Sequence, residues 1–304
     1  MKIARFFCTD SNKSLTIFQH RDKNWYDIEI VLGPQCQYLY HWEENFKQLN
    51  QWVPDNHPPI VMDHSKLLPP FQPVSFRDFY SFEDHVKTAR AKRNLDMNPL
   101  WYKIPVFYFS NPFSMIGHGA NAMPPQGCEE LDFELELGVV IGKAGKDIPA
   151  SKAWEHIAGL TIINDLSARD LQRKEMSLQL GPSKAKDFAT ALGPYFITLD
   201  EFSSNIEKDI LHLNMNAQLN GTKISKGNSH SMYHNWPKII EHASRDVTLQ
   251  PGELLGSGTV GSGCILELGA DNTGGYLSAG DRIDLTIEKL GTLTTHIVER
   301  NSHA

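Results

Sequence analysis

Apolar residues in the first seventy positions fall into short segments separated by polar ones. The apolar and β-branched residues at 15–19 and 26–32 predict two short strands, and the pattern at 42–52 predicts a helix. Six prolines between Pro54 and Pro73 exclude a continuous helix or a central strand there, so we interpret this stretch as a connector. The chain is therefore predicted to divide near residue 70. A small N-terminal β domain with its Pro-rich connector (residues 1–70) precedes a main domain (residues 71–304).

The main domain combines predicted strands with scattered helices. Helices are expected at residues 76–93, at 151–158 with Ser151 as N-cap, and at 236–244. Alternating apolar residues over 211–219 lead into Asn220-Gly221, which is a strong β-hairpin signal. Further strands are expected at 131–141, 160–163, 265–268, 282–289 and 293–299. Because strands and helices do not alternate regularly, we predict a mainly β chain with helices, of the α+β class, and not a doubly wound parallel sheet.

One predicted strand carries acidic residues at every second position. Asp132, Glu134 and Glu136 alternate with apolar residues within residues 131–141, so their side chains should emerge on the same face. Ionised carboxylates on one face repel one another, and burying them is costly unless a cation lies among them. A solvent-exposed face is the commoner explanation for an isolated pattern of this kind, and half of a metal site is the alternative.

Composition narrows the class of protein. The 304 residues are 40% hydrophobic and 21% charged, which is ordinary for a soluble globular chain. A net charge of −7 argues against a nucleic-acid partner that needs a basic patch. The N-terminus has no apolar signal segment, no long apolar run predicts a membrane span, and the four cysteines form no Cys-x-x-Cys pair. We therefore expect a cytoplasmic protein without a membrane partner, a zinc ribbon or a disulfide framework.

Two other segments place polar groups near predicted strands. Asp165 is expected to follow a buried strand and open a helix, with Arg169 and Gln172 on the same face four and seven residues later. A structural explanation is that Asp165 caps the helix and pairs with Arg169; a functional one gives Asp165 to a metal and directs Arg169 and Gln172 into the same cavity. Asp78 and His85 are two turns apart on the predicted helix at 76–93.

A glycine pattern resembles a nucleotide-binding sequence. Gly256, Gly258 and Gly261 match Gly-x-Gly-x-x-Gly, which binds a dinucleotide only when a helix follows it. Since residues 265–268 have a strand pattern, we reject a nucleotide site there. A loop whose backbone amides approach an anionic group remains an alternative.

The order of these motifs along the chain resembles the fumarylacetoacetate hydrolase family. The matching segments, from about residue 73 to about residue 299, are Asp-Phe-Tyr with a His seven residues after the Asp, Pro-Val-x-Tyr, Asp-x-Glu-x-Glu, Asn-Asp-x-Ser-Ala-Arg-Asp-x-Gln, Gly-Pro-x-x-x-Lys, Ser-Gly-Thr and Leu-Glu-Leu. The Asn-Asp-x-Ser-Ala-Arg-Asp-x-Gln segment is the most specific. The resemblance implies a mixed β-roll catalytic domain and a homodimer.

The resemblance also implies roles for individual residues. The four carboxylates that match the family's ligands for a divalent cation (Mg²⁺, or Ca²⁺ or Mn²⁺) are Asp78, Glu134, Glu136 and Asp165. His85 matches the general base and Glu267 the carboxylate that orients it. The polar groups around the reacting carbonyl match Arg169, Gln172 and Lys186, and the substrate-holding groups match Tyr80, Tyr108 and Thr259. Asp132 has no counterpart, and we expect it at the rim of the strand or in a local pairing.

The activity implied by the resemblance is hydrolysis of a carbon–carbon bond in a β-diketo acid, such as fumarylacetoacetate or another acylpyruvate. The alternative is a metal-dependent decarboxylase or isomerase of oxaloacetate-like or oxo-diene acids in aromatic catabolism, and a non-catalytic binding protein is a third hypothesis. The chain departs from the animal hydrolase at Phe107 and Phe109, which replace Gly and His beside Tyr108. A larger, more apolar pocket wall is expected there, so the keto-acid substrate stays open.

Overall fold

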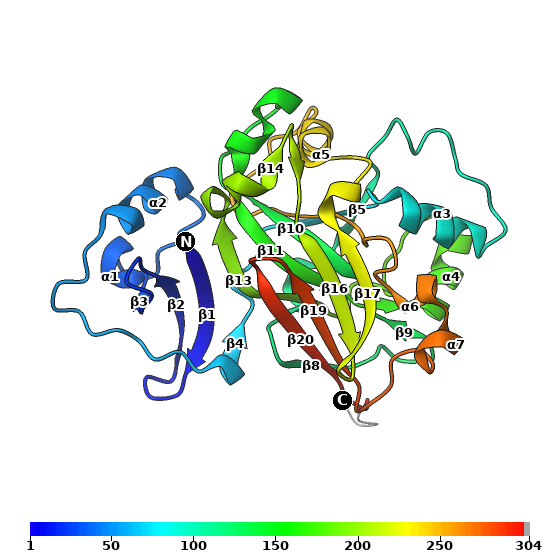
Figure 1. Cartoon of the computed structure of the whole chain (residues 1–304), viewed down its shortest axis with the longest axis horizontal. Coiled ribbons are helices and arrows are strands. Elements are labelled where there is room, and N and C mark those ends of the chain that lie inside the picture. The colour runs from blue at the N-terminus through cyan, green and yellow to red at the C-terminus, as the bar shows by residue number, and fades with distance from the viewer. Residues whose placement is uncertain (301–304) are drawn as a thin grey trace.

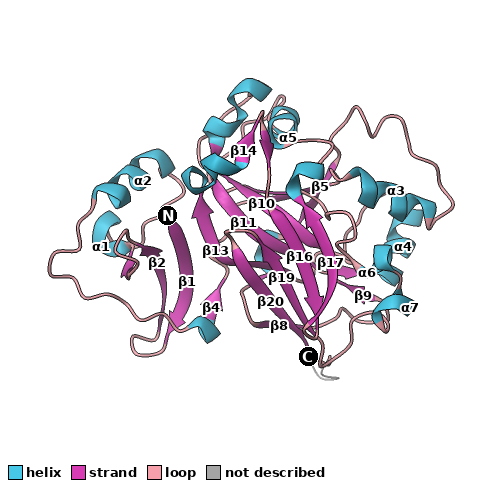
Figure 2. Cartoon of the chain, viewed as in Figure 1, coloured by secondary structure: helices cyan, strands magenta, loops and turns pink. Residues whose placement is uncertain are grey.

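The structure is a computed structural model that describes residues 1–300, so residues 301–304 of the predicted main domain lie outside the described part. Strands occupy the interior of the molecule and most helices lie at its periphery (Figure 2). This arrangement agrees with the predicted α+β class.

The largest sheet has eleven strands, and its main path follows the order β3-β2-β1-β13-β11-β10-β18-β5-β6 (Figure 1). These strands are β1 (Lys2–Cys8), β2 (Lys13–Gln19), β3 (Trp25–Asp27), β5 (Phe76–Phe79), β6 (Phe107–Ser110), β10 (Leu135–Ile141), β11 (Ile157–Asp165), β13 (Thr190–Thr198) and β18 (Leu254–Gly256). Off this path, β4 (Leu67–Leu68) pairs with β1, and β7 (Met115–Ile116) pairs with β13. The N-terminal strands thus continue the sheet of the main domain, and the division near residue 70 stays a prediction.

A second sheet of five strands has the order β17-β16-β19-β20-β8. Its strands are β8 (Ala120–Ala122), β16 (Asn214–Leu219), β17 (Thr222–Asn228), β19 (Arg282–Ile287) and β20 (Gly291–Ile297). The predicted hairpin is confirmed, because β16 and β17 are joined by Asn220 and Gly221, which both have positive φ. Two small pairs complete the strands: β9 (Leu131–Asp132) with β12 (Ser167–Ala168), and β14 (Ile206–Glu207) with β15 (Ile210–Leu211).

The helices are short. The α-helices are α1 (Glu29–Leu32), α2 (Trp42–Gln51), α3 (Glu83–Ala91), α4 (Arg169–Ser177), α5 (Trp236–Ala243), α6 (Ile265–Leu268) and α7 (Ala270–Thr273). Single 3-10 turns or short 3-10 helices lie at His64–Lys66, Pro112–Ser114, Ala150–His156, Leu199–Asn205 and Ser229–Ser231. The predicted helices at 42–52 and 236–244 are therefore confirmed as α2 and α5. No helix within residues 1–300 has the length and apolar character needed to cross a membrane.

The large sheet is buried on both faces. Val139 and Ile162 on one face join an apolar cluster that includes Met215 of β16 and Leu285 of β19, so this core lies between the two sheets. The next residues along each strand, Val140 and Ile163, face a different cluster with Phe18 of β2 and Trp42 of α2. Side chains alternate along a strand, so the centre of the sheet contacts apolar layers on both sides. Because β10 and β11 are packed on both faces, they fix the positions of the residues at their ends.

Three predicted elements change type in the structure. Residues 26–32 are not one strand: β3 ends at Asp27, whose side chain accepts a hydrogen bond from Glu29 N (3.0 Å), and α1 follows with Ile28 as its N-cap. Residues 76–79 are not helical but form β5, because they pair with β18 and β6 on either side; α3 begins only at Glu83. The predicted strand at 265–268 is α6. In the first two cases neighbouring hydrogen bonds override the local pattern.

Three further boundaries were wrong. The helix predicted at 151–158 is a 3-10 helix with Pro149, not Ser151, as N-cap, and its last two residues belong to β11. The strand predicted at 131–141 is interrupted between β9 and β10. Asp165 does not open a helix: it is the last residue of β11, and α4 begins at Arg169.

Candidate active site and metal centre

A cavity of about 620 Å³ lies where β5, β6 and β10 meet α3 and α4. Ten of the twelve site residues implied by the resemblance line it: Asp78, Tyr80, His85, Tyr108, Glu134, Glu136, Arg169, Gln172, Lys186 and Thr259. The other two, Asp165 and Glu267, lie directly behind this lining, because they bond to Lys186 and His85 respectively. The chain thus brings together residues that are up to 189 positions apart in sequence, from Asp78 to Glu267.

Four carboxylates converge at one side of the cavity. Asp78 at the end of β5, Glu134 and Glu136 near the start of β10, and Asp165 at the end of β11 each place an oxygen within 4.8 Å of the others. All four are buried, the most exposed at 5%. In the sheet order, β18 lies between β5 and β10, so Asp78 and Glu136 approach each other across this strand.

Gly256 of β18 makes that approach possible. It pairs with Asp78 on one side and with Gly138 on the other. A Cβ atom at Gly256 would collide with Asp78 Oδ1 and lie 3.1 Å from Glu136 Oε2. The glycine is therefore required by the space between the two carboxylates. The sequence pattern had pointed to this glycine, but only as part of a rejected nucleotide motif.

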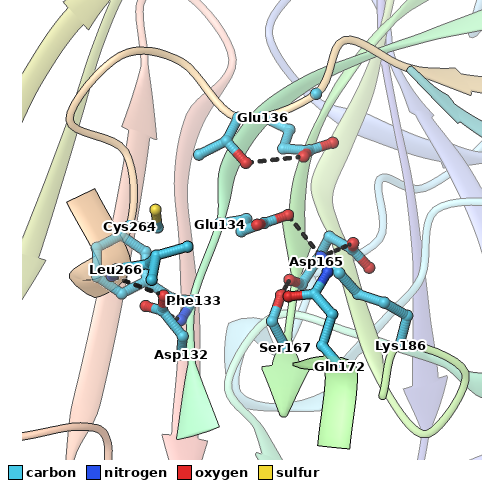
Figure 3. A network of polar contacts seen from close by, with 12 residues as sticks. Asp132, Phe133, Glu134, Glu136, Asp165, Ser167, Gln172, Lys186, Cys264 and Leu266 are labelled. Carbon is cyan, nitrogen blue, oxygen red and sulfur yellow. Dashed lines mark hydrogen bonds and ion pairs between the residues drawn. The ribbon is translucent and has the colours of Figure 1, made fainter. Parts of the chain in front are cut away.

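Two cations neutralise half of the acidic cluster. Lys186 Nζ donates to Glu134 Oε2 (2.6 Å) and to Asp165 Oδ2 (2.5 Å), and Arg169 Nη2 donates to Glu134 Oε1 (2.7 Å). Figure 3 shows Lys186 and Asp165 side by side next to Glu134. Burial alone would raise the pKa of Glu134, but the charges of Lys186 and Arg169 outweigh it and hold this pKa well below its usual range. Glu134 is therefore ionised.

Asp78 and Glu136 form the other half and lack such partners. Among the described residues, Asp78 Oδ1 and Glu136 Oε2 are buried oxygens without a hydrogen-bond donor. Burial, and then the charge of Asp165, raise the pKa of Asp78 to about 8, and burial with the charge of Asp78 raises the pKa of Glu136 well above its ordinary value. Buried carboxylate oxygens without a partner mark the place where a cation would be stabilised. An oxygen-only set of this kind suits Mg²⁺, Ca²⁺ or Mn²⁺.

A histidine–carboxylate pair also borders the cavity. His85 of α3 is 4% exposed, and its Nδ1 lies 2.5 Å from Glu267 Oε1. The second oxygen of Glu267 accepts a hydrogen bond from Ser262 N (2.9 Å), so the carboxylate is fixed at both ends. A carboxylate accepts, so Nδ1 carries the proton in this pair and Nε2 is the free nitrogen. The ring of Tyr80 packs edge-on against the His85 ring with the centroids 5.3 Å apart.

Of the remaining polar residues of the site, Tyr108 and Thr259 contact the acidic cluster directly and Gln172 contacts Arg169. Tyr108 Oη donates to Asp165 Oδ2 (2.5 Å), and Thr259 Oγ1 lies 3.4 Å from Glu136 Oε1. Gln172 Oε1 accepts from Arg169 Nη1 (3.1 Å). Burial raises the pKa of Tyr80 to about 12 and raises the pKa of Tyr108 well above its ordinary value, so both hydroxyls stay protonated and can donate. Of the two departures from the animal hydrolase, Phe107 lines the cavity, whereas Phe109 is 61% exposed and packs over Arg77.

Of the two expectations for Asp132, the rim of the strand or a local pairing, the rim is wrong. It is fully buried and accepts four hydrogen bonds, one of them from Arg169 Nε (2.9 Å). The structural explanation that paired Arg169 with Asp165 is also wrong, since Arg169 bonds to Asp132 and Glu134 instead. The reason is that Asp165 belongs to β11, so Asp165 and Arg169 do not share a helix. The sequence contained a signal, since Asp132 is the first acid of the alternating pattern, but it did not show the break in the strand after Asp132.

Comparison with known proteins identifies the family to which this chain belongs. Residues 75–298, well over half of the chain, match the family model described as the fumarylacetoacetate (FAA) hydrolase C-terminal domain. The chain is an enzyme of the fumarylacetoacetate hydrolase superfamily, and it belongs to the fumarylacetoacetate hydrolase family.

Relatives in this family carry different activities in their names. The oxaloacetate tautomerase YisK of Bacillus subtilis is 32% identical over 197 residues, which cover 64% of this chain and 61% of the relative. The fumarylacetoacetase of Bos taurus is 32% identical over 272 residues, covering 69% of this chain and 64% of the relative. The chain thus spans less than two thirds of the length of these two relatives.

Solved structures share the whole fold. The fumarylacetoacetate hydrolase of Exiguobacterium antarcticum superposes with a TM-score of 0.77 at 25% identity, covering 99% of this chain and 100% of the other. A putative HpcE protein of Mycobacterium smegmatis gives a TM-score of 0.79 at 23% identity with the same coverage, which shows the fold alone.

Proposed function

We propose that this protein is a divalent-metal-dependent hydrolase that cleaves a carbon–carbon bond of a β-diketo acid, with fumarylacetoacetate or another acylpyruvate as substrate. The observation that supports it most is the contact between His85 Nδ1 and Glu267 Oε1 at 2.5 Å. Attack of water on a ketone needs a base that is held in a fixed orientation, and the bond to Glu267 orients the imidazole of His85.

The acidic cluster fits the cation that the family implies. Asp78, Glu134, Glu136 and Asp165 would hold it, and the oxygens of Asp78 and Glu136 that have no hydrogen-bond donor within residues 1–300 would become its ligands. When bound, a hard divalent cation polarises carbonyl oxygens as a Lewis acid. We propose Mg²⁺ as this cation, with Ca²⁺ and Mn²⁺ as alternatives.

The chain's own residues account for proton transfer. His85 Nε2 takes a proton from water as the oxygen of that water bonds to the ketone carbon, and Glu267 stabilises the imidazolium that results. Lys186 Nζ and Gln172 are donors beside the cavity, where negative charge develops on the ketone oxygen. When the carbon–carbon bond breaks, its electron pair goes to the leaving carbon as an enolate. The imidazolium of His85 gives its proton to the enolate carbon, which restores the base, and the products are a carboxylic acid and a keto acid.

Substrate binding is proposed for three hydroxyl groups. Tyr80, Tyr108 and Thr259 line the same cavity, and the two tyrosines stay protonated at neutral pH. Their hydroxyls can therefore donate to the carboxylate and ketone oxygens of a keto acid. Phe107 makes one wall of the cavity apolar, which favours a substrate with an apolar substituent at that end.

A second candidate is isomerisation, tautomerisation or decarboxylation of an oxaloacetate-like or oxo-diene acid. The observation that favours it is the name of the relative from Bacillus subtilis, an oxaloacetate tautomerase with 32% identity. Tautomerisation needs a base that removes a proton and returns it, but no water at the ketone carbon. The same His85 could serve either reaction.

One experiment separates these activities. The purified protein is incubated with Mg²⁺ and with acylpyruvates, fumarylacetoacetate, oxaloacetate and an oxo-diene diacid, and the products are identified by mass spectrometry and NMR. A pair of acids from an acylpyruvate supports the hydrolase. Enol–keto interconversion of oxaloacetate or release of CO₂ from it, with no acylpyruvate cleaved into two acids, would favour the second candidate over the hydrolase. Binding of a keto acid without turnover would indicate a receptor.

We also propose a homodimer, on the basis of the resemblance. Light scattering after size-exclusion chromatography tests it, and a mass near 34.3 kDa, that of one chain, would contradict it.

A further inference from the structure

Asp132 is the acid of the alternating pattern that does not line the cavity, yet it has more hydrogen bonds than the acids that do. Its side chain is 0% exposed. Oδ1 accepts from Phe133 N (2.8 Å) and Ile265 N (2.7 Å), and Oδ2 accepts from Leu266 N (2.9 Å) and Arg169 Nε (2.9 Å). A buried carboxylate with four donors is fully satisfied, so Asp132 has no capacity left for a cation or a substrate.

Two of these donors belong to α6, which carries Glu267. The helix has only four residues, and Cys264 at its N-cap makes no side-chain capping bond. The first N–H groups of a helix have no partner within it, and here Asp132 accepts from two of them. A helix this short is unstable without tertiary support. Asp132 therefore determines where α6 lies and, with it, where Glu267 meets His85. Figure 3 shows Asp132 next to Leu266.

The fourth donor connects Asp132 to the acidic cluster. Arg169 uses Nε for Asp132 and Nη2 for Glu134, with both partners buried. One guanidinium thus bridges Asp132 and a carboxylate of the cluster. The direction of the Arg169 side chain depends on Asp132, because Nε is the nitrogen closest to the chain and fixes the plane of the group.

We propose that Asp132 is a positioning residue that fixes the Glu267–His85 pair and the Arg169 side chain relative to each other. It touches neither substrate nor cation and acts through α6 on one side of the cavity and through Arg169 on the other. The kinetic part of this proposal rests on the proposed function, whereas the structural part does not.

The structural part can be tested without any substrate. In Asp132→Asn, the amide nitrogen replaces one oxygen and faces a donor, either an α6 N–H or Arg169, so one contact is lost. The probe is the far-downfield ¹H NMR resonance of the Nδ1 proton of His85, which is assigned by its loss in Glu267→Gln. We expect this resonance to weaken or vanish in Asp132→Asn while circular dichroism stays that of the wild type. An unchanged resonance would overturn the proposal.

A matched control distinguishes the positioning effect of Asp132 from the general effect of removing a buried carboxylate. Asp284 is 6% exposed and accepts hydrogen bonds from Arg282 Nε (3.0 Å) and Thr294 Oγ1 (2.6 Å) in the second sheet. Asp284→Asn should retain the His85 resonance. Asp132→Ser, a smaller residue that keeps one oxygen, is the second variant if Asp132→Asn does not fold. If neither folds while Asp284→Asn does, Asp132 is needed for the fold and not for placing the pair, and the proposal is overturned.

The kinetic part uses whichever turnover the wild type shows. Displacing a catalytic pair by about 1 Å can cost on the order of 10²-fold in rate, so kcat should fall by that order in Asp132→Asn with little change in KM. In a Glu267→Gln background the same substitution should lower kcat far less, because both changes act on one unit. Equal effects in the two backgrounds would contradict action through Glu267. A wild type without turnover would sink the proposed function and leave the NMR test standing.

Discussion

Lys186 Nζ lies 2.5 Å from Asp165 Oδ2, and both side chains are buried against the acidic cluster. Removing one partner of a buried ion pair leaves an uncompensated charge and typically costs about 3–5 kcal/mol. We therefore expect Lys186→Met to lower the free energy of unfolding by that amount, measured by urea denaturation in EDTA. As a control, Lys238→Met removes the exposed pair with Glu241 and should change the stability little. A Lys186→Met variant as stable as the wild type would contradict this account of the cluster.

Cation binding should stabilise the protein. Binding to the folded state alone adds about 2.7 kcal/mol when the cation is present at 100 times its Kd. Mg²⁺ should raise the Tm of the wild type after EDTA treatment, and Asp78→Asn or Glu136→Gln should reduce this rise, because each removes a carboxylate whose oxygen has no other partner. Asp284→Asn is the control and should keep the response. A wild-type Tm unaffected by Mg²⁺, Ca²⁺ and Mn²⁺ would rule out the cation site.

The histidine–carboxylate pair should affect turnover and not cation binding. General-base catalysis contributes about 10²–10⁴-fold, so His85→Ala should lower kcat by at least that range and keep the Tm response to Mg²⁺. Glu267→Gln should lower kcat less than His85→Ala does, since the imidazole of His85 is present but is no longer oriented by a carboxylate. His156→Ala removes a histidine that bonds to the Lys143 carbonyl, away from the cavity, and should leave kcat unchanged. Hydrolysis that persists in His85→Ala would refute the assigned role.

The site was easier to predict than the elements that carry it. The alternation of Glu134 and Glu136 with apolar residues predicted only that they share a face, and the resemblance to the family then proposed them as metal ligands. Asp78 and His85 were placed together for the wrong reason: they belong to β5 and α3 and not to one helix. An apolar stripe over residues 76–93 does not reveal that residues 76–79 will pair with β18 and β6 and form a strand.

The errors that remain share a physical cause. The four residues of α6 have a strand-like pattern, yet they form a helix whose first N–H groups, those of Ile265 and Leu266, donate to Asp132. Asp132 is more than 130 positions away in the chain, so no local pattern contains this information. The same holds for Gly256, whose importance lies in the space between Asp78 and Glu136. The motifs and the resemblance propose candidate residues, and the sheet order determines how these residues meet.

Stability should fall in mild acid because of a buried histidine. His234 is 5% exposed, and burial lowers its pKa from 6.5 although its Nε2 bonds to the Trp101 carbonyl (2.7 Å). A folded-state pKa below the unfolded value gives stability that is present above about pH 6.5 and lost as the pH falls through the folded-state value. His234→Gln should reduce the loss of unfolding free energy between neutral pH and pH about 5, measured with urea. The exposed His57, changed to Gln, is the control. An identical pH dependence in the wild type and His234→Gln would contradict this assignment.

Gly256 should be essential for the cation response because it leaves room for two carboxylates. In Gly256→Ala the new methyl group would collide with Asp78 Oδ1 and press on Glu136 Oε2, so both oxygens must move. Overpacking of a buried site costs about 1–3 kcal/mol, and we expect that loss of stability together with loss of the Mg²⁺-induced rise in Tm. Gly138→Ala is a matched control in the adjacent strand, since its methyl group would meet only the apolar ends of Ile163 and Leu254. That variant should be destabilised and still respond to Mg²⁺. If Gly256→Ala responds to Mg²⁺ as strongly as Gly138→Ala does, the cation does not lie between Asp78 and Glu136.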